Sequence, residues 1–70
     1  MIDQAELVNR FTYHAPHGNQ QEKYQNLRLL GLSLAKHIVE NTPVSREQSV
    51  ALTKLEEAIF WANASIARNE

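Results

Sequence analysis

No cysteine occurs among the 70 residues, so neither a disulfide nor a thiolate–zinc site can stabilise this chain. No apolar run approaches the roughly 20 residues that a membrane-spanning helix needs. The opening sequence, Met-Ile-Asp-Gln-Ala-Glu, lacks the basic and then apolar character of a signal peptide. We therefore expect a soluble, intracellular protein that has no membrane partner.

Neither sign of charge is in large excess, because the net charge is −1 and basic and acidic residues are interspersed. Non-specific binding to nucleic acid needs a basic face, so we expect no DNA or RNA polymer as a partner. A local pocket for a small anion remains compatible with this balance. The hydrophobic content of 43% is ordinary for a globular protein, and the length allows one domain spanning residues 1–70.

The longest helical pattern lies at residues 45–68, where apolar positions recur with spacings of three and four residues. Pro43 breaks the preceding helix, and Ser45 with Gln48 has the S-x-x-Q form of a capping box. The pattern predicts one amphipathic helix that packs along a single stripe. That stripe comprises Gln48, Leu52, Leu55, Ile59, Ala62 and Ile66.

A second long helix is predicted for residues 19–42, with Asn19 as its N-cap and Glu22 at the third helical position. Gly31 lies within its apolar face, where glycine costs about 1 kcal/mol of helix propensity relative to alanine. A close helix crossing or a ligand at that point would explain this glycine. The turn to the next helix is short, which predicts an antiparallel αα-hairpin and an all-α fold. The expected apolar face comprises Tyr24, Leu27, Leu30, Gly31, Leu34, Ala35 and Ile38.

Residues 3–10 are predicted to form a short helix capped by Asp3, although so short a helix needs a surface to dock on. Residues 11–18 differ in composition from the predicted helices, because they include two aromatics, two histidines, a proline and a glycine. Pro16 disfavours helix at the preceding residue, and Gly18 can adopt backbone angles that other residues avoid. We interpret this segment as an ordered arm and leave two roles open. It is either a connector whose aromatics fill the core or an arm that contacts a ligand.

Two helices alone bury too little apolar surface to offset the cost of folding, since ordering each residue costs about 1–2 kcal/mol of backbone entropy. Small chains without disulfides or metals commonly gain stability by association. Five further apolar residues fall off the two stripes, which indicates a second buried surface. We therefore predict a homo-oligomer; the alternative is a monomer in which the arm folds back over them. The expected interface residues are Leu29, Leu32, Val50, Phe60 and Trp61.

Enzyme signatures are missing from the sequence, which has no nucleophile elbow, P-loop or dinucleotide-binding glycine motif. We expect neither catalysis nor a cofactor. His14 and His17 could supply two metal ligands, but Pro16 interrupts their spacing and no third ligand is evident, so we expect no metal. The chain does offer rings that can stack on bases and cations that can bind phosphate. These are Phe11 and Tyr13 for stacking, and Arg10, Lys23 and Arg28 for phosphate.

Three stretches in combination resemble a known protein family. They are Phe11-Thr-Tyr-His-Ala-Pro16, the arginine of Asn26-Leu-Arg28, and Pro43-Val-Ser-Arg-Glu-Gln-Ser-Val-Ala-Leu-Thr-Lys-Leu-Glu-Glu-Ala58 followed by Trp61-Ala-Asn-Ala64. The family is that of small phage proteins called anti-CBASS cyclic-oligonucleotide sponges, whose helical-hairpin domain also occurs in an anti-Thoeris sponge. The resemblance runs from about Asn9 onward.

This resemblance implies a compact homohexamer, located in the cytoplasm of an infected bacterial host cell, that sequesters cyclic dinucleotides or related immune messengers without cleaving them. It implies pockets between protomers that use an aromatic of the arm and a basic residue of the first long helix, which here are Tyr13 and Arg28. Some members also bind cyclic trinucleotides where arginines of several protomers converge, which makes Arg68 the candidate here. The residues expected at the cyclic dinucleotide site are Phe11, Tyr13, His14, Pro16, Lys23 and Arg28.

Two other functions remain open. A helical-hairpin module could bind another protein through Phe60 and Trp61, in which case no nucleotide would raise the melting temperature. A nucleotide-cleaving enzyme would instead turn its ligand over, so that intact ligand could not be recovered from the protein.

Overall fold

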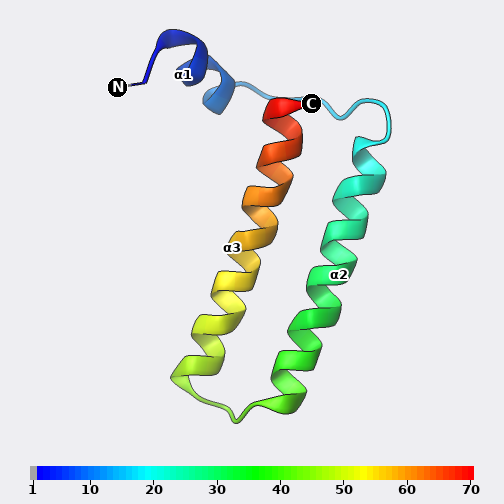
Figure 1. The fold of residues 1–70 in the computed structure, drawn as a ribbon, viewed down its shortest axis with the longest axis vertical. Coiled ribbons are helices and arrows are strands. Elements are labelled where there is room, and N and C mark those ends of the chain that lie inside the picture. Colours follow the sequence, from blue (N-terminus) through cyan, green and yellow to red (C-terminus); the bar gives the residue numbers. More distant parts are fainter. Residues whose placement is uncertain (1) are drawn as a thin grey trace.

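The computed structural model describes residues 2–70, and within that range it contains three α-helices and no strands. These are α1 (Gln4–Phe11), α2 (Gln20–Asn41) and α3 (Arg46–Asn69). Figure 1 shows α2 and α3 running antiparallel as a hairpin, with α1 and the connecting arm at the open end beside the C-terminal end of α3. The predicted all-α class and the helical hairpin are therefore confirmed.

Two of the three helices begin at side-chain caps. The carboxylate of Asp3 accepts a hydrogen bond from the backbone N–H of Glu6 at 2.8 Å, and the hydroxyl of Ser45 accepts one from Gln48 at 3.1 Å. Gln48 does not complete a reciprocal capping box, because its side chain donates instead to the carbonyl of Thr42 at 3.1 Å and to the Thr42 hydroxyl at 3.0 Å. Gln48 thus fastens the start of α3 to the end of α2 and closes the turn.

The start of α2 differs from our prediction. Asn19 makes no side-chain cap hydrogen bond; instead, the side chain of Gln20 accepts one from the backbone N–H of His17 at 3.1 Å. Gly18 has a φ of 57°, in the left-handed region that glycine tolerates best, and so lets the arm turn into the helix. At the other end of the arm, Phe11 is the last residue of α1 rather than the first residue of the arm.

The two long helices meet along the predicted stripe of α3, where all six side chains are half-buried. The face of α2 is narrower than we predicted. Leu30 and Leu34 are exposed, because they lie to one side of the line along which α2 touches α3. The residues of the predicted α2 face that are buried or half-buried are Tyr24, Leu27, Gly31, Ala35 and Ile38.

Gly31 marks the closest approach of the two helices. A Cβ atom at this position would lie 3.0 Å from Cγ1 and 3.1 Å from Cδ1 of Ile59. We expect Gly31→Ala to lower the free energy of unfolding by about 1 kcal/mol, because overpacking outweighs the gain in helix propensity. The double variant Gly31→Ala/Ile59→Ala should lose less than the sum of the two single variants, measured by chemical denaturation in a double-mutant cycle. Simple additivity would contradict a tight crossing at this point.

The hairpin has no buried apolar side chain anywhere in residues 2–70. Its Cα radius of gyration is 15.3 Å, compared with about 11 Å for a compact domain of this length. The chain exposes 5758 Å², whereas a typical folded monomer of this size exposes roughly 4,450 Å². The excess of roughly 1,300 Å² exceeds the ~800 Å² that each partner buries in a standard protein interface. The single protomer is a flat layer without an interior of its own.

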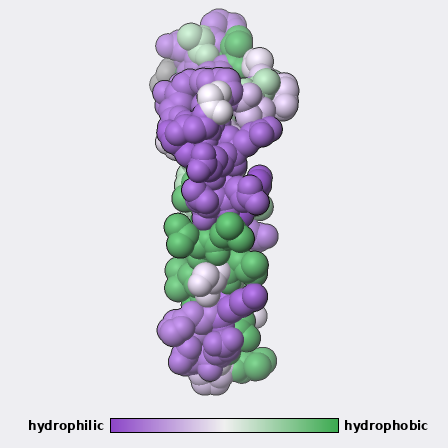
Figure 2. Space-filling view, turned by 90° about the vertical axis from the view of Figure 1, so that its right-hand side faces the viewer, coloured by the Kyte–Doolittle hydropathy of each residue, from purple (hydrophilic) through white to green (hydrophobic). Residues whose placement is uncertain are grey.

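Apolar side chains lie on the outside of this layer. Figure 2 shows a hydrophobic band across the middle of the hairpin on the side that α2 presents, with hydrophilic surface above and below it. The arm does not fold back to cover the five predicted interface residues, because all five are exposed. Phe60 is 62% exposed and Trp61 is 65% exposed. The alternative of a monomer sealed by its own arm therefore does not hold for this structure.

Candidate functional site

A hollow of about 650 Å³, the arm hollow, lies between the arm and the first half of α2. Its volume falls within the roughly 300–1,000 Å³ typical of small-molecule sites. Two phenol rings, an imidazole and a guanidinium line the same space. Aromatic rings can stack on nucleobases, and a guanidinium can bind phosphate. The residues lining it are Tyr13, His14 and Pro16 from the arm, and Gln21, Tyr24, Gln25 and Arg28 from α2.

Helix α2 supplies its share of the hollow from one face. Gln21, Gln25 and Arg28 are spaced by four and three residues, so their side chains lie above one another along the helix. Tyr24 completes the same face and is half-buried, whereas Arg28 is exposed. The helix therefore presents two amides, an aromatic ring and a cation to the hollow.

The arm is held in place through His14. Its Nε2 atom lies 2.8 Å from the backbone carbonyl oxygen of Asn9, and the ring is half-buried. Because a carbonyl oxygen can only accept a hydrogen bond, Nε2 carries the hydrogen, which leaves Nδ1 as the ring nitrogen able to face a ligand. Tyr13 beside it is 83% exposed, so its ring is free to stack.

Four of the six predicted cyclic dinucleotide residues line this hollow, and two do not. Phe11 is 83% exposed and lines a separate depression formed with Leu7, Val8 and Thr12. Lys23 donates to both carboxylate oxygens of Glu70, at 2.9 Å each, and so is engaged with the end of α3.

The ion pair between Lys23 and Glu70 is a surface contact. The hydrogen bond from Lys23 holds the pKa of the Glu70 carboxyl below its usual value. A lowered carboxyl pKa means that the contribution of the pair is present at neutral pH and is lost as the pH falls through that pKa. Both side chains are 40% exposed, so the pair adds little to stability.

A second hollow, of about 500 Å³, runs along the groove between α2 and α3. Arg28 lines this groove as well as the arm hollow, and so lies between the two. Within the groove-lining residues, Asn63 has a buried side-chain oxygen for which residues 2–70 provide no hydrogen-bond donor. Buried acceptors are nearly always paired in native proteins, so this oxygen is an exception among the described residues.

Arg68 lies in the last turn of α3 and is half-buried. Its backbone carbonyl oxygen accepts a hydrogen bond from the side chain of Asn9 at 3.4 Å. Arg68 is thus at the same end of the molecule as the arm, although it does not line the hollow between the arm and α2.

The comparison with known protein families gives one match. The model of the family described as the Acb2/Tad1 hairpin domain matches residues 3–67, which is nearly the whole chain. The chain belongs to the Acb2/Tad1 hairpin family. This is the anti-CBASS and anti-Thoeris sponge family, so the resemblance found in the sequence is confirmed. No curated protein and no solved structure matches the chain.

None of the three helices described is long and apolar enough to cross a bilayer. In the part of the chain that the structure describes, no group of three His, Cys, Asp or Glu side chains is placed to hold a metal ion.

Sequence reasoning missed three residues of the arm hollow, namely Gln21, Tyr24 and Gln25. The signal for the two glutamines was their helical spacing from Arg28, which places all three on one face. Tyr24 was assigned to the stripe that packs on α3, and it serves both surfaces because it lies at their border.

Proposed function

We propose that this member of the Acb2/Tad1 hairpin family binds cyclic oligonucleotide second messengers, foremost cyclic dinucleotides, and sequesters them without cleavage. The observation that carries the proposal is the arm hollow, in which Tyr13 and Arg28 line one open space. Such binding would withhold the messenger from CBASS-type or Thoeris-type immune signalling in an infected bacterial cell.

Each group in the hollow has a chemical role in this proposal. The exposed ring of Tyr13 stacks on a base, an interaction worth about 1–3 kcal/mol in single-strand complexes. The guanidinium of Arg28 binds a phosphate through charge-assisted hydrogen bonds. Pro16 stiffens the arm, and His14 offers Nδ1 to a polar edge of the ligand. Sequestration requires no group that attacks the phosphodiester.

The arm hollow is open to solvent in the single protomer, and a second copy of the chain would close it. We infer a homo-oligomer, a hexamer by the family resemblance, in which the exposed residues Leu29, Leu32, Val50, Phe60 and Trp61 form the contacts. The missing interior and the excess exposed surface support this inference. Two-fold symmetric pairing suits a ligand that is itself nearly two-fold symmetric.

Arg68 is our candidate for a second site, which would take cyclic trinucleotides. Arg68 lies in the last turn of α3 and does not line the arm hollow. Arginines from several copies could converge there on the phosphates of one ring.

Thermal stability measured with a panel of cyclic dinucleotides, cyclic trinucleotides and cyclic ADP-ribose isomers tests the proposed function. A ligand present at about 100 times its dissociation constant stabilises the bound state by about 2.7 kcal/mol, so the matching compound should raise the melting temperature by several degrees. Linear dinucleotides serve as controls and should raise it less. After heat denaturation, chromatography should recover the ligand intact.

Two outcomes would contradict this proposal. If no compound of the panel shifts the melting temperature, the protein is not a sponge for these messengers. If the ligand is recovered as linear products, the protein is an enzyme.

The exposed pair Phe60 and Trp61 favours one competing function, that of a module binding a different protein. Trp is enriched among residues that dominate binding energy at interfaces. This function predicts that no cyclic nucleotide changes the melting temperature, which the same experiment measures.

A further inference from the structure

We propose that Gln20 is a positioning residue for the cyclic nucleotide site: its buried side chain ties the arm to the last turn of α3 and so holds Tyr13 in the hollow that Arg28 also lines. The inference rests on the proposed function for its consequence, but the tie itself can be tested without any ligand.

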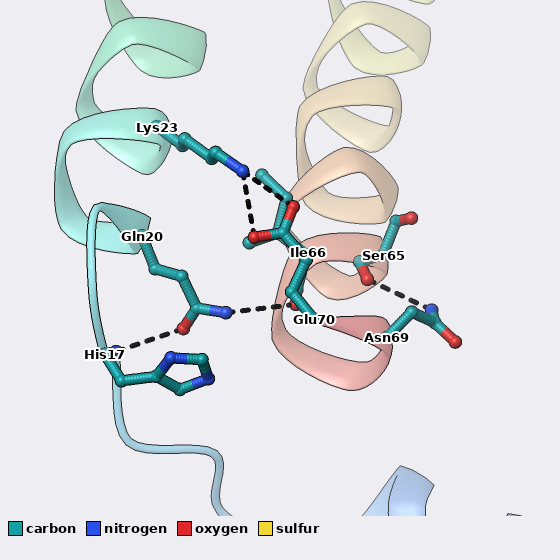
Figure 3. Close-up of polar contacts among 7 residues, drawn as sticks. All are labelled: His17, Gln20, Lys23, Ser65, Ile66, Asn69 and Glu70. Atoms are coloured by element: carbon teal, nitrogen blue, oxygen red, sulfur yellow. Dashed lines mark hydrogen bonds and ion pairs between the residues drawn. The ribbon is translucent and has the colours of Figure 1, made fainter.

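Gln20 is the one buried polar residue within residues 2–70, and it is 3% exposed. Its Oε1 atom accepts a hydrogen bond from the backbone N–H of His17 at 3.1 Å. Its Nε2 atom donates to the carbonyl oxygen of Ile66 at 3.5 Å. Figure 3 shows this amide lying between the arm and the end of α3, with one contact to each. A single buried amide therefore connects two segments that are far apart in the sequence.

The other end of the arm is tied to the same turn of α3. Asn9 donates from its side chain to the carbonyl oxygen of Arg68 at 3.4 Å, and its own carbonyl oxygen holds the ring of His14 at 2.8 Å. The last four carbonyls of a helix include groups without intrahelical partners, so this turn has acceptors to offer. Residues 14–17 are therefore attached at both ends to one rigid element.

The neighbouring ion pair between Lys23 and Glu70 is a weaker tie. Its two side chains are each 40% exposed, and exposed pairs of this kind contribute little. It also starts from α2 and not from the arm, so it fixes the helix ends without fixing the arm. Gln20, by contrast, bonds the arm directly at the backbone N–H of His17.

Without this tie, affinity for the ligand would fall because the arm of the free protein is less often in its binding position. The complex itself would lose no contact with the ligand. If the arm occupies its binding position only part of the time, the apparent dissociation constant rises by the inverse of that fraction. Association then slows, while dissociation of the bound ligand changes little. A variant that removes a ligand contact, such as Tyr13→Ala, should instead speed dissociation.

Gln20→Met tests the proposal, because methionine keeps the length of the side chain but removes both hydrogen bonds. The matched control is Gln48→Met, which removes a half-buried glutamine tie at the opposite, closed end of the hairpin. The first measurement is hydrogen exchange of the arm amides of residues 12–15 and 17 in the free protein. The second is the association and dissociation rate of a fluorescent cyclic GMP–AMP.

We expect Gln20→Met to speed exchange in the arm at least tenfold and to slow association about tenfold, with dissociation within twofold of wild type. Gln48→Met should leave both the arm exchange and the association rate unchanged, even if it lowers the melting temperature as much. Unchanged arm exchange in Gln20→Met would overturn the proposal. So would faster exchange accompanied by unchanged association.

Failure of the proposed function would look different from failure of this inference. If the wild-type protein binds no cyclic nucleotide, the sponge function is wrong, yet faster arm exchange in Gln20→Met would still establish the tie. If wild type binds and the variant binds at the same rate, only the positioning role of Gln20 is wrong.

Discussion

Replacing Arg28 by alanine is expected to weaken cyclic dinucleotide binding by about 10- to 150-fold, the equivalent of a charged hydrogen bond worth roughly 1.5–3 kcal/mol. Tyr13→Ala should weaken it by about 5- to 150-fold, the range of one base-stacking contact. Titration calorimetry measures both losses. The oligomer should stay intact in each variant, because neither residue belongs to the predicted interface.

Arg46→Ala is the control for the loss of one positive charge. Arg46 begins α3 at the closed end of the hairpin, far along the molecule from the arm. Its replacement should leave affinity within twofold of wild type. Unchanged affinity in both Arg28→Ala and Tyr13→Ala would remove the arm hollow from consideration as the ligand site.

The second large effect is expected from Trp61→Asp, which should break the oligomer. The indole is 65% exposed in the single protomer, and truncating a central aromatic at an interface commonly costs 2 kcal/mol or more. A buried, unpaired carboxylate adds a further penalty. Sedimentation velocity should show the main species moving to the mass of one chain. Helicity measured by circular dichroism should fall with it, because the free hairpin has no core.

Ser49→Asp separates the effect of charge from the loss of the indole. Ser49 is exposed near the start of α3, where a carboxylate favours the helix. This variant should sediment like wild type. An unchanged oligomer in Trp61→Asp would show that α3 uses a different face, and the predicted interface would be wrong.

The helices could be predicted because local rules decide them. The spacing of Leu52, Leu55 and Ile59 defines a face that no other secondary structure would keep together, and all three are half-buried against α2. Gly31 was singled out by its position within an apolar face, and its closeness to Ile59 explains it. The cap at Ser45 follows from a hydroxyl placed three residues before Gln48.

The details that escaped prediction are those set by tertiary contacts. Asn19 is a good cap by type, yet its side chain makes no cap hydrogen bond, and the neighbouring Gln20 instead links His17 to the end of α3. By charge, Lys23 would suit a phosphate as well as Arg28 does, but its ammonium group is paired with the carboxylate of Glu70. Spacing along α2 cannot reveal either partner, since both lie more than 40 residues away in the sequence.

Prediction of the candidate site depended on two sources. Residue chemistry alone identified rings and cations, but it did not distinguish Tyr13 from Phe11 or Arg28 from Lys23. The family resemblance chose Tyr13 and Arg28, and the structure places both at the same hollow. Phe11 was grouped with the arm because helix ends are poorly marked in sequence, and the helix continues through it.

Native mass spectrometry of the protein mixed with cyclic GMP–AMP tests the central claim most directly, because one spectrum reports the number of chains, the number of ligands and the ligand mass. Our account predicts an assembly of several 8.0 kDa chains that carries about one uncleaved ligand for every two chains, as expected for sites shared by symmetric pairs. A folded single chain without ligand, or an assembly that carries only cleaved ligand, would contradict it.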